Sequence, residues 1–267
     1  MGAAMRRLGA STRRAAIEYL PAGLLLASLV AGWEAWVRVF DTRPYIMPAP
    51  SRVWTAFLET RGTLPEHITT TLSEALLGLA IAAAAGVALA AILALTPFVR
   101  RVLYPILVVS QTIPMIVLAP LLVIWFGFGM TPKVVVVALF GFFPICVSTA
   151  EGLLTADREM TGLVRSMGGG RLASLRYVEI PAALPSFFSG LKIAATYAVL
   201  GAVIGEWVGA SSGLGIFITR AQTAFRVDRV FVAVAVIAVV SVALFAAVHV
   251  AARLTTPWMY VNKEKES

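Results

Sequence analysis

Charged residues are scarce in this sequence. Only 13% of its 267 residues are Asp, Glu, Lys or Arg, whereas soluble domains carry about 25%. Because 59% of the residues are hydrophobic, the composition places the chain in the integral membrane class. The formal net charge is +8, but the basic residues lie in short clusters between apolar runs. Such clusters are typical of positive cytoplasmic loops and argue against a nucleic-acid partner.

Side chains with catalytic or metal-binding chemistry are also scarce. Cys146 is the single cysteine, so no intrachain disulfide can form. The two histidines, His67 and His249, are far apart in sequence and lack metal-ligand spacing, so we expect no metal site. There is no P-loop pattern, and no motif of a serine hydrolase or a zinc protease is present. The sequence therefore disfavours an intramembrane enzyme and an ATP site of its own.

What the sequence does contain is a series of long apolar runs. A hydrocarbon core of about 30 Å needs about 20 helical residues, and we expect an all-α membrane protein with about six spans. The expected transmembrane domain covers residues 19–252, with spans at about 19–39, 71–95, 102–126, 134–150, 186–208 and 230–252. The remaining parts are a basic N-terminus (1–18), a polar loop (151–185) and a charged tail (253–267).

The first apolar run has the basic flank of a signal peptide, but it is too long for one, and we expect an uncleaved span. With the N-terminus inside, the inner segments hold 13 Lys and Arg residues and the outer segments hold 8. This bias predicts that both termini lie in the cytoplasm.

The interval from Asp157 to Pro185 is the longest polar stretch between apolar segments in the second half. It carries four arginines and ends in two prolines. A membrane protein gains nothing from so many polar residues between two spans unless something outside the bilayer binds there. We therefore interpret this interval as a docking element for a cytoplasmic partner.

Polar residues inside the spans are candidates for a transport pathway. An ionisable group at the bilayer centre costs about 2.5–3.5 kcal/mol, yet Glu34, Glu74, Lys192 and Glu206 fall within or at the ends of spans. Their ordinary roles would be an interfacial carboxylate (Glu34, Glu206), a helix cap (Glu74) and a snorkelling amine (Lys192).

The third span contains a polar run that ends in a proline. Proline in a span frees a backbone carbonyl, and broken spans often line transport cavities. We predict that the pathway is lined by Ser110, Gln111, Thr112 and Pro114, and that Glu206 also contacts it.

At the polar interval, the sequence resembles the permease subunits of binding-protein-dependent ABC importers, in the group for nitrate, sulfonates, taurine and thiamine pyrimidine precursors. Asp157, Glu159, Arg165, Met167 and Gly168 match the loop motif of that family, and residues 180–185 follow at the expected distance. The defining E-A-A triplet is replaced by residues 162–164, which read Gly-Leu-Val. The acidic residue that many relatives place on this helix is therefore missing.

Further stretches resemble the same family in the same order. They are residues 47–54 after the first span, 111–127 in the third span, and 205–215 after the fifth span. The resemblance covers about residues 20–255.

The resemblance implies a type I ABC importer permease fold in the bacterial inner membrane. Two permease copies, expected to be identical, would form one pathway, ATPase subunits would dock on the polar loop, and an extracytoplasmic binding protein would deliver the solute. ATP and Mg would be bound by the ATPase, so no cofactor is expected in this chain. The implied ATPase-coupling residues are Asp157, Glu159, Thr161, Gly162, Leu163, Val164, Arg165, Met167, Gly168, Ile180, Pro181 and Pro185.

The substrate is open at this point. The stretch from Ala195 to Gly215 looks most like transporters of thiamine pyrimidine precursors, while riboflavin, sulfonate, taurine and nitrate remain alternatives. A second hypothesis is an ion-coupled secondary transporter, for which Glu34, Glu74 and Glu206 are the motivation.

Overall fold

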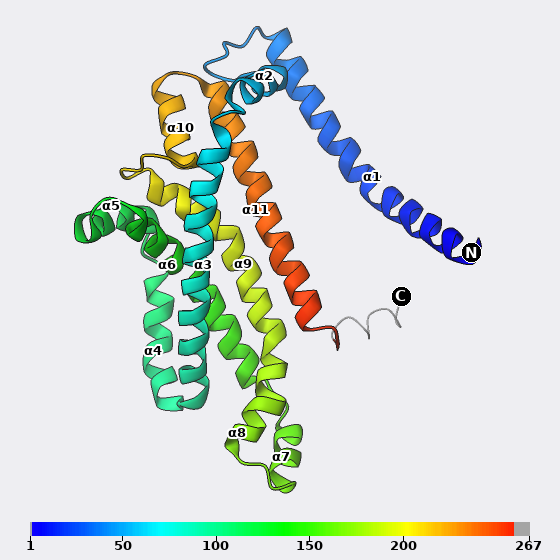
Figure 1. The fold of residues 1–267 in the computed structure, drawn as a ribbon, viewed down its shortest axis with the longest axis vertical. Coiled ribbons are helices and arrows are strands. Elements are labelled where there is room, and N and C mark those ends of the chain that lie inside the picture. The colour runs from blue at the N-terminus through cyan, green and yellow to red at the C-terminus, as the bar shows by residue number, and fades with distance from the viewer. Residues whose placement is uncertain (1, 259–267) are drawn as a thin grey trace. The chain divides into compact units, whose positions relative to one another are not determined.

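The computed structural model describes the backbone of residues 2–258 and the side chains of residues 20–258. Every regular element in this described range is helical (Figure 1). The elements are α1 (Gly2–Val39), α2 (Pro50–Thr60), α3 (Leu64–Leu95), α4 (Pro97–Ser110), α5 (Met115–Phe126), α6 (Met130–Leu154), α7 (Arg158–Ser166), α8 (Arg171–Ser174), the π-helical turn η1 (Leu175–Glu179), α9 (Ile180–Glu206), α10 (Leu214–Thr223) and α11 (Val227–Thr255).

Several of these helices are long and apolar enough to cross a bilayer. Five such spans are present in the described residues: Leu20–Val39, Leu64–Leu95, Met130–Leu154, Arg171–Glu206 and Val227–Thr255. Helices α4 and α5 add a sixth if they are counted as one broken span. The prediction of an all-α membrane protein with about six spans is confirmed.

The expected third span is not one straight helix. Its two halves, α4 and α5, are bent by 98° relative to each other. The cause is local, because Pro114 has no N–H to donate to the carbonyl of Ser110, and a residue that precedes proline disfavours the α conformation. The helix α4 therefore ends at Ser110, and Pro114 is itself extended (ψ 115°) before α5 begins at Met115.

Most of the polar interval that we expected to be a loop is helical. α6 continues to Leu154, α7 follows after a short turn, and Arg171–Glu206 forms one continuous helical segment that includes α8, η1 and α9. The π-helical turn directly precedes Ile180 and Pro181. A local change of hydrogen-bond register lets the helix pass a proline that has no N–H to donate.

The chain forms two compact units, Met1–Arg61 with Ala221–Val232, and Gly62–Arg220 with Ala233–Ser267. In the first unit, the N-cap position of α2 is Ala49, which makes no side-chain hydrogen bond to the helix start. The Glu34 carboxylate instead accepts hydrogen bonds from the backbone N–H (3.0 Å) and the hydroxyl (2.8 Å) of Ser51. It thus satisfies a donor that the helix start leaves free.

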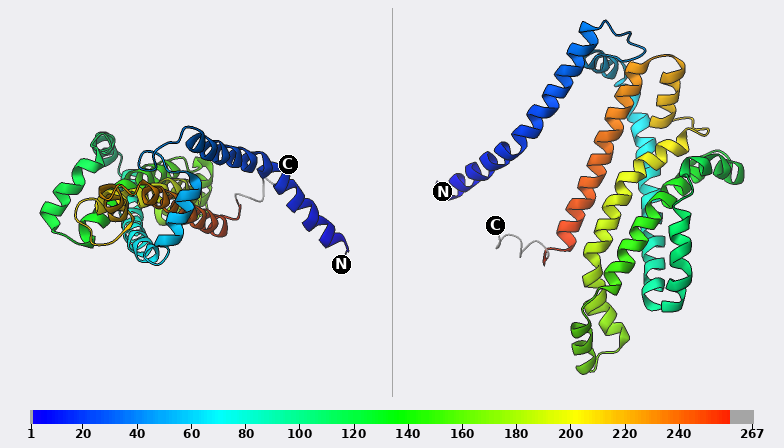
Figure 2. Two further views of the ribbon diagram at one scale, coloured as in Figure 1. Left: turned by 90° about the horizontal axis from the view of Figure 1, so that it is seen from above. Right: turned by 180° about the vertical axis from the view of Figure 1, so that it is seen from behind.

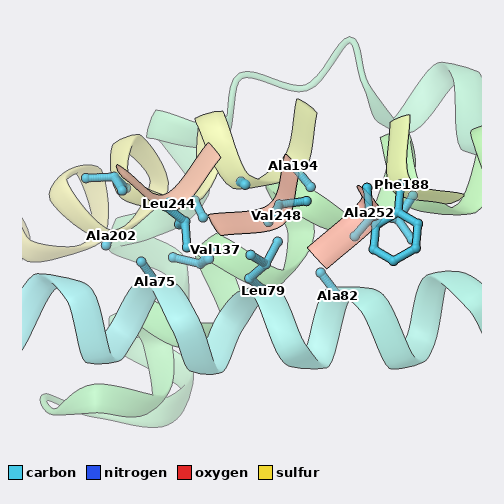
Figure 3. Close-up of a cluster of buried hydrophobic side chains, with 14 residues drawn as sticks. Ala75, Leu79, Ala82, Val137, Phe188, Ala194, Ala202, Leu244, Val248 and Ala252 are labelled. Atoms are coloured by element: carbon cyan, nitrogen blue, oxygen red, sulfur yellow. The ribbon is translucent and has the colours of Figure 1, made fainter. Parts of the chain in front are cut away.

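In the second unit, α6 packs against both α3 and α9, and the three helices lie side by side in different views (Figures 1 and 2). The core that they share contains many small residues, including Ala75, Ala82, Ala194 and Ala202, and it also contains Val137 and Phe188 (Figure 3). Lipid tails are as apolar as these side chains, so close packing, rather than hydrophobic burial, drives the association of helices in a membrane. The alanine-rich composition of α3 is explained by this packing.

Candidate functional site

The first candidate element is α7, whose start is fixed by Asp157. The carboxylate of this residue accepts hydrogen bonds from the backbone N–H groups of Glu159 (2.8 Å) and Met160 (3.4 Å). Asp is among the preferred N-cap residues, and its negative charge also suits the positive end of the helix. The helix therefore begins at Arg158, directly after this cap.

The end of α7 is fixed by glycine. Gly168 has φ +85°, a conformation that only glycine adopts without strain. Its N–H donates to the carbonyl of Arg165 (3.0 Å), and the N–H of Gly169 donates to the carbonyl of Val164 (2.9 Å). These two bonds form a Schellman motif, which satisfies carbonyls at the helix end.

Between these caps, α7 carries a row of uncovered apolar side chains. Met160, Leu163 and Met167 are 50%, 53% and 79% exposed. Their spacing of three and four residues places them on one face of a helix. Exposed apolar faces of this kind are a common feature of partner-binding surfaces.

A hollow of about 400 Å³ lies beside α7. Arg158, Arg165 and Arg171 line it together with Glu179, and Arg171 lies 3.4 Å from the Glu179 carboxylate. Thr161 and Gly162 line the same hollow, whereas Ile180, Pro181 and Pro185 belong to α9 and do not line it. The structure therefore brings only part of the expected coupling set together.

The second candidate is the bend between α4 and α5. The hydroxyls of Ser110 and Thr112 donate to the carbonyls of Leu107 (2.7 Å) and Val109 (2.8 Å) within their own turns. Gln111 lines a hollow of about 450 Å³ whose other walls are Phe140, Phe143, Pro144, Val147 and Ser148 of α6, and Ile193 and Tyr197 of α9. Of the predicted pathway residues, only Gln111 faces this space.

Glu206 occupies a different, fully buried place at the start of α10. Its carboxylate accepts hydrogen bonds from the Thr71 hydroxyl (2.6 Å) and from the backbone N–H of Gly215. The N–H groups of the two preceding residues are also held by α3, since Gly213 donates to Nδ1 of His67 (3.0 Å) and Leu214 donates to the Thr71 hydroxyl (2.8 Å).

Three consecutive donors at the beginning of α10 are therefore taken up by side chains. They are the groups that a helix start leaves without partners. Gly213 has φ +123°, and a side chain at this position would collide with the Glu206 carboxylate. This arrangement fixes the segment between α9 and α10 against α3.

A buried ion pair that sequence reasoning missed lies nearby. The Lys133 ammonium group is 2.7 Å from Oε1 of Glu74, and both residues are more than 90% buried. Glu74 was expected to cap the start of its helix, but α3 begins ten residues earlier, at Leu64. The sequence held a partial signal, because opposite charges stand at the outer ends of the second and fourth predicted spans.

The first unit has a charged hollow of about 490 Å³, lined by Arg52, Glu59, Arg226 and Asp228 among others. Arg226 donates hydrogen bonds to Glu59 (2.8 Å) and Asp228 (3.0 Å). The hydrogen bond from Arg226 lowers the pKa of Glu59, and the bonds to Asp228 and Glu59 raise the pKa of Arg226. The cluster therefore stays ionised at neutral pH.

Comparison with protein families gives one match over most of the chain. Residues 82–259 match the family described as "Binding-protein-dependent transport system inner membrane component". The matched range includes the bend, α7 and the segment before α10.

Curated relatives carry names from the same class of transporter. The chain is 36% identical to the formylaminopyrimidine transport permease protein ThiX of Halalkalibacterium halodurans, over 88% of this chain and 94% of the relative. It is also 36% identical to the riboflavin transport system permease protein RibX of Chloroflexus aurantiacus (90% and 89% covered). Identity to the taurine transport system permease protein TauC of Escherichia coli is 30% (87% of each).

A solved structure has the same fold at low sequence identity. It is a chain of an amino acid ABC transporter crystallised with histidines, with a TM-score of 0.57 and 19% identity. The similarity covers 75% of this chain and 97% of that one.

Proposed function

Because this chain belongs to the family of binding-protein-dependent transport system inner membrane components, and is thus an ABC importer permease of the bacterial inner membrane, we propose that α7 is its coupling helix and that Gln111 faces its translocation pathway. The observation that carries the proposal is α7 itself. It is capped at both ends by its own sequence, and it leaves an apolar row uncovered. A helix with these properties is suited to dock in a groove of a partner.

The contacts with the ATPase differ in kind from those that the family motif implies. Gly162, Leu163 and Val164 occupy the E-A-A positions, so an acidic contact is replaced by apolar surface. Leu163 is 53% exposed and belongs to the apolar row. Docking through this row would rely on shape and apolar burial, while Arg158 and Arg165 at the adjacent hollow supply positive charge toward the partner.

In this arrangement, α7 lies in the cytoplasm together with both termini, and the binding protein meets the opposite side. A second, identical copy of the permease completes the pathway, since Gln111 lies at the surface of a single copy. ATP and Mg are bound by the ATPase subunits, and this chain transmits their motion.

The substrate that we favour is a thiamine pyrimidine precursor. Two relatives at 36% identity are named for formylaminopyrimidine and riboflavin, and both names denote nitrogen heterocycles. Relatives named for taurine and for aliphatic sulfonates are 29–30% identical. The order of these identities supports a heterocycle over a sulfonate.

An ion-coupled secondary transporter receives little support from its three candidate carboxylates. Glu34 is bound by Ser51 and Arg38, Glu74 is paired with Lys133, and Glu206 caps α10. Each of these groups has a structural partner in the described part of the chain.

The test of the proposal is deletion of Thr161–Gly168 from the permease expressed with its ATPase and binding protein. We expect the deleted protein to insert in the membrane, to lose co-purification with the ATPase, and to lose ATP-driven uptake. As a control, the outer segment 209–212 is deleted instead, and the ATPase should still co-purify with this variant. Normal co-purification of the ATPase with the deletion variant would refute α7 as the coupling helix.

A further inference from the structure

The hollow beside the bend has a composition that discriminates among possible solutes. Its lining residues are Gln111 of the bend, five residues of α6, and Ile193 and Tyr197 of α9. None of the described residues that line it carries a charge. Lys192, the neighbour of Ile193, does not line the hollow. We infer that this hollow is a binding site within the permease for an uncharged, planar nitrogen heterocycle, an inference that rests on the proposed function.

Aromatic rings in the wall of the hollow can stack against a planar solute. Phe140 and Tyr197 face each other with ring planes only 16° apart and centroids 6.4 Å apart. Tyr197 is 46% exposed, so part of its surface is left uncovered by the chain. A planar ring that enters the hollow can extend this stack, and such offset stacking is a preferred arrangement of aromatic groups.

The hollow is also lined by polar side chains that have no hydrogen-bond partner among the described residues. The side chains of Gln111, Ser148 and Tyr197 all line the hollow, and none of them donates to or accepts from another side chain or carbonyl in the described range. Unsatisfied polar groups are costly within a membrane unless they face water or a ligand. The amide of Gln111 offers both donors and an acceptor, which match the ring nitrogens and amino groups of a heterocycle.

The uncharged lining of the hollow disfavours an anionic solute. A sulfonate or nitrate ion loses much of its hydration on entering a protein site, and proteins compensate such anions with arginine, lysine or a row of backbone N–H groups. The hollow offers one amide and two hydroxyls instead. Its volume of about 450 Å³ lies within the range of about 300–1,000 Å³ that small-molecule sites occupy.

The experiment measures equilibrium binding to the purified permease–ATPase complex without its binding protein. The radiolabelled or fluorescent probes are a formylaminopyrimidine, riboflavin and taurine. We expect the wild-type complex to bind a ring probe and not taurine. Tyr197→Leu removes the ring while keeping apolar volume and should weaken ring binding about tenfold or more, whereas Tyr197→Phe keeps the ring and should bind nearly as the wild type does.

Control variants separate the site from general effects. Phe245→Leu alters an exposed aromatic residue of α11 outside the hollow and should leave binding unchanged. Gln111→Leu should weaken ring binding without affecting assembly with the ATPase. Occupation of the hollow by lipid or by the second permease copy would give no ring binding in the wild type.

The inference is overturned by the absence of ring binding in the wild type, by taurine binding that equals ring binding, or by ring binding that is the same in Tyr197→Leu. Co-purification of the ATPase is scored separately on the same samples. Loss of that association would refute the proposed role of α7, while ring binding can still be measured on the permease alone.

Discussion

Glu206 shows how one buried side chain can organise the end of a span. Its two oxygens accept from different elements, the Thr71 hydroxyl of α3 and the Gly215 N–H of α10. The carboxylate thus ties the C-terminus of α9 to the start of α10 and to α3. The sequence placed it at a membrane interface and suggested a pathway contact, but the structure places it away from the hollow that Gln111 lines.

Glu206→Gln tests this capping role. A glutamine side chain has only one acceptor oxygen, so it cannot accept from both the Thr71 hydroxyl and the Gly215 N–H, and one of these two hydrogen bonds is lost. An unsatisfied buried donor costs about 1–3 kcal/mol, and we expect a lower thermal unfolding midpoint of the purified permease and faster proteolysis at residues 209–213. Glu66→Gln, at an exposed carboxylate of α3, is the matched control, and equal midpoints for the two variants would contradict the capping role.

The pair of Glu74 and Lys133 makes a second prediction at this scale. Lys133→Met removes the cation and leaves a buried carboxylate whose Oε2 already has no hydrogen-bond partner. Breaking one side of a buried pair costs about 3–5 kcal/mol, whereas replacement of both partners by apolar residues is often nearly neutral. We therefore expect Lys133→Met to be strongly destabilising and Glu74→Met with Lys133→Met to recover most of the loss in a double-mutant cycle. Additive effects of the two substitutions would show that the pair does not interact.

At the scale of elements, the two ends of α7 within the polar interval can be predicted from the residues found there. Asp157 and Gly168 are typical of helix ends, and both act as caps of α7. The break at Pro114 follows equally from local chemistry. The continuous helix from Arg171 into α9 could not be predicted in this way, because it passes Pro181 through a π-helical turn whose stability depends on surrounding structure.

Contacts between residues of different spans could not be predicted from the sequence either. Local patterns place Glu74 and Lys133 near the ends of separate spans, but only the packing of α3 against α6 shows that they meet. The hollow beside Gln111 likewise needs α6 and α9 in register, since Phe140 and Tyr197 are far apart in sequence. Hydropathy therefore predicts that the spans exist, while the site depends on how they pack.

The N-terminal cap of α7 gives a prediction for coupling. Asp157→Ala removes the acceptor for two backbone N–H groups and should cost about 1 kcal/mol of helix stability. If α7 must be helical to dock, the association of the ATPase with solubilised permease should weaken about fivefold. Asp157→Ser keeps a capping oxygen and should stay close to the wild type in the same titration. Equal affinities for the alanine variant and the wild type would show that docking does not depend on this cap.

At the scale of the second unit, α6 and α9 connect α7 with the hollow that Gln111 lines and with the buried contacts of Glu206. α9 has 27 residues, which corresponds to a length of about 40 Å. It runs from the segment after α7 and α8 to Glu206, and α6, which carries Lys133 in its first turn, ends just before α7. The hollow with Gln111 lies against the middle of both helices. A displacement of α7 would therefore be carried by rigid helices past the hollow to the buried polar contacts at the other end.

The central claim, that α7 is the surface on which the ATPase acts, is tested most directly by site-specific cross-linking in membranes. Cys146 is the only native cysteine and is fully buried, so a cysteine introduced at an exposed position is the accessible thiol. Leu163→Cys, on the apolar row of α7, should cross-link to the co-expressed ATPase with a yield that changes on addition of ATP, whereas Ser211→Cys, in the exposed segment before α10, should give no such product. No cross-link from Leu163→Cys, or an equal cross-link from Ser211→Cys, would contradict the account.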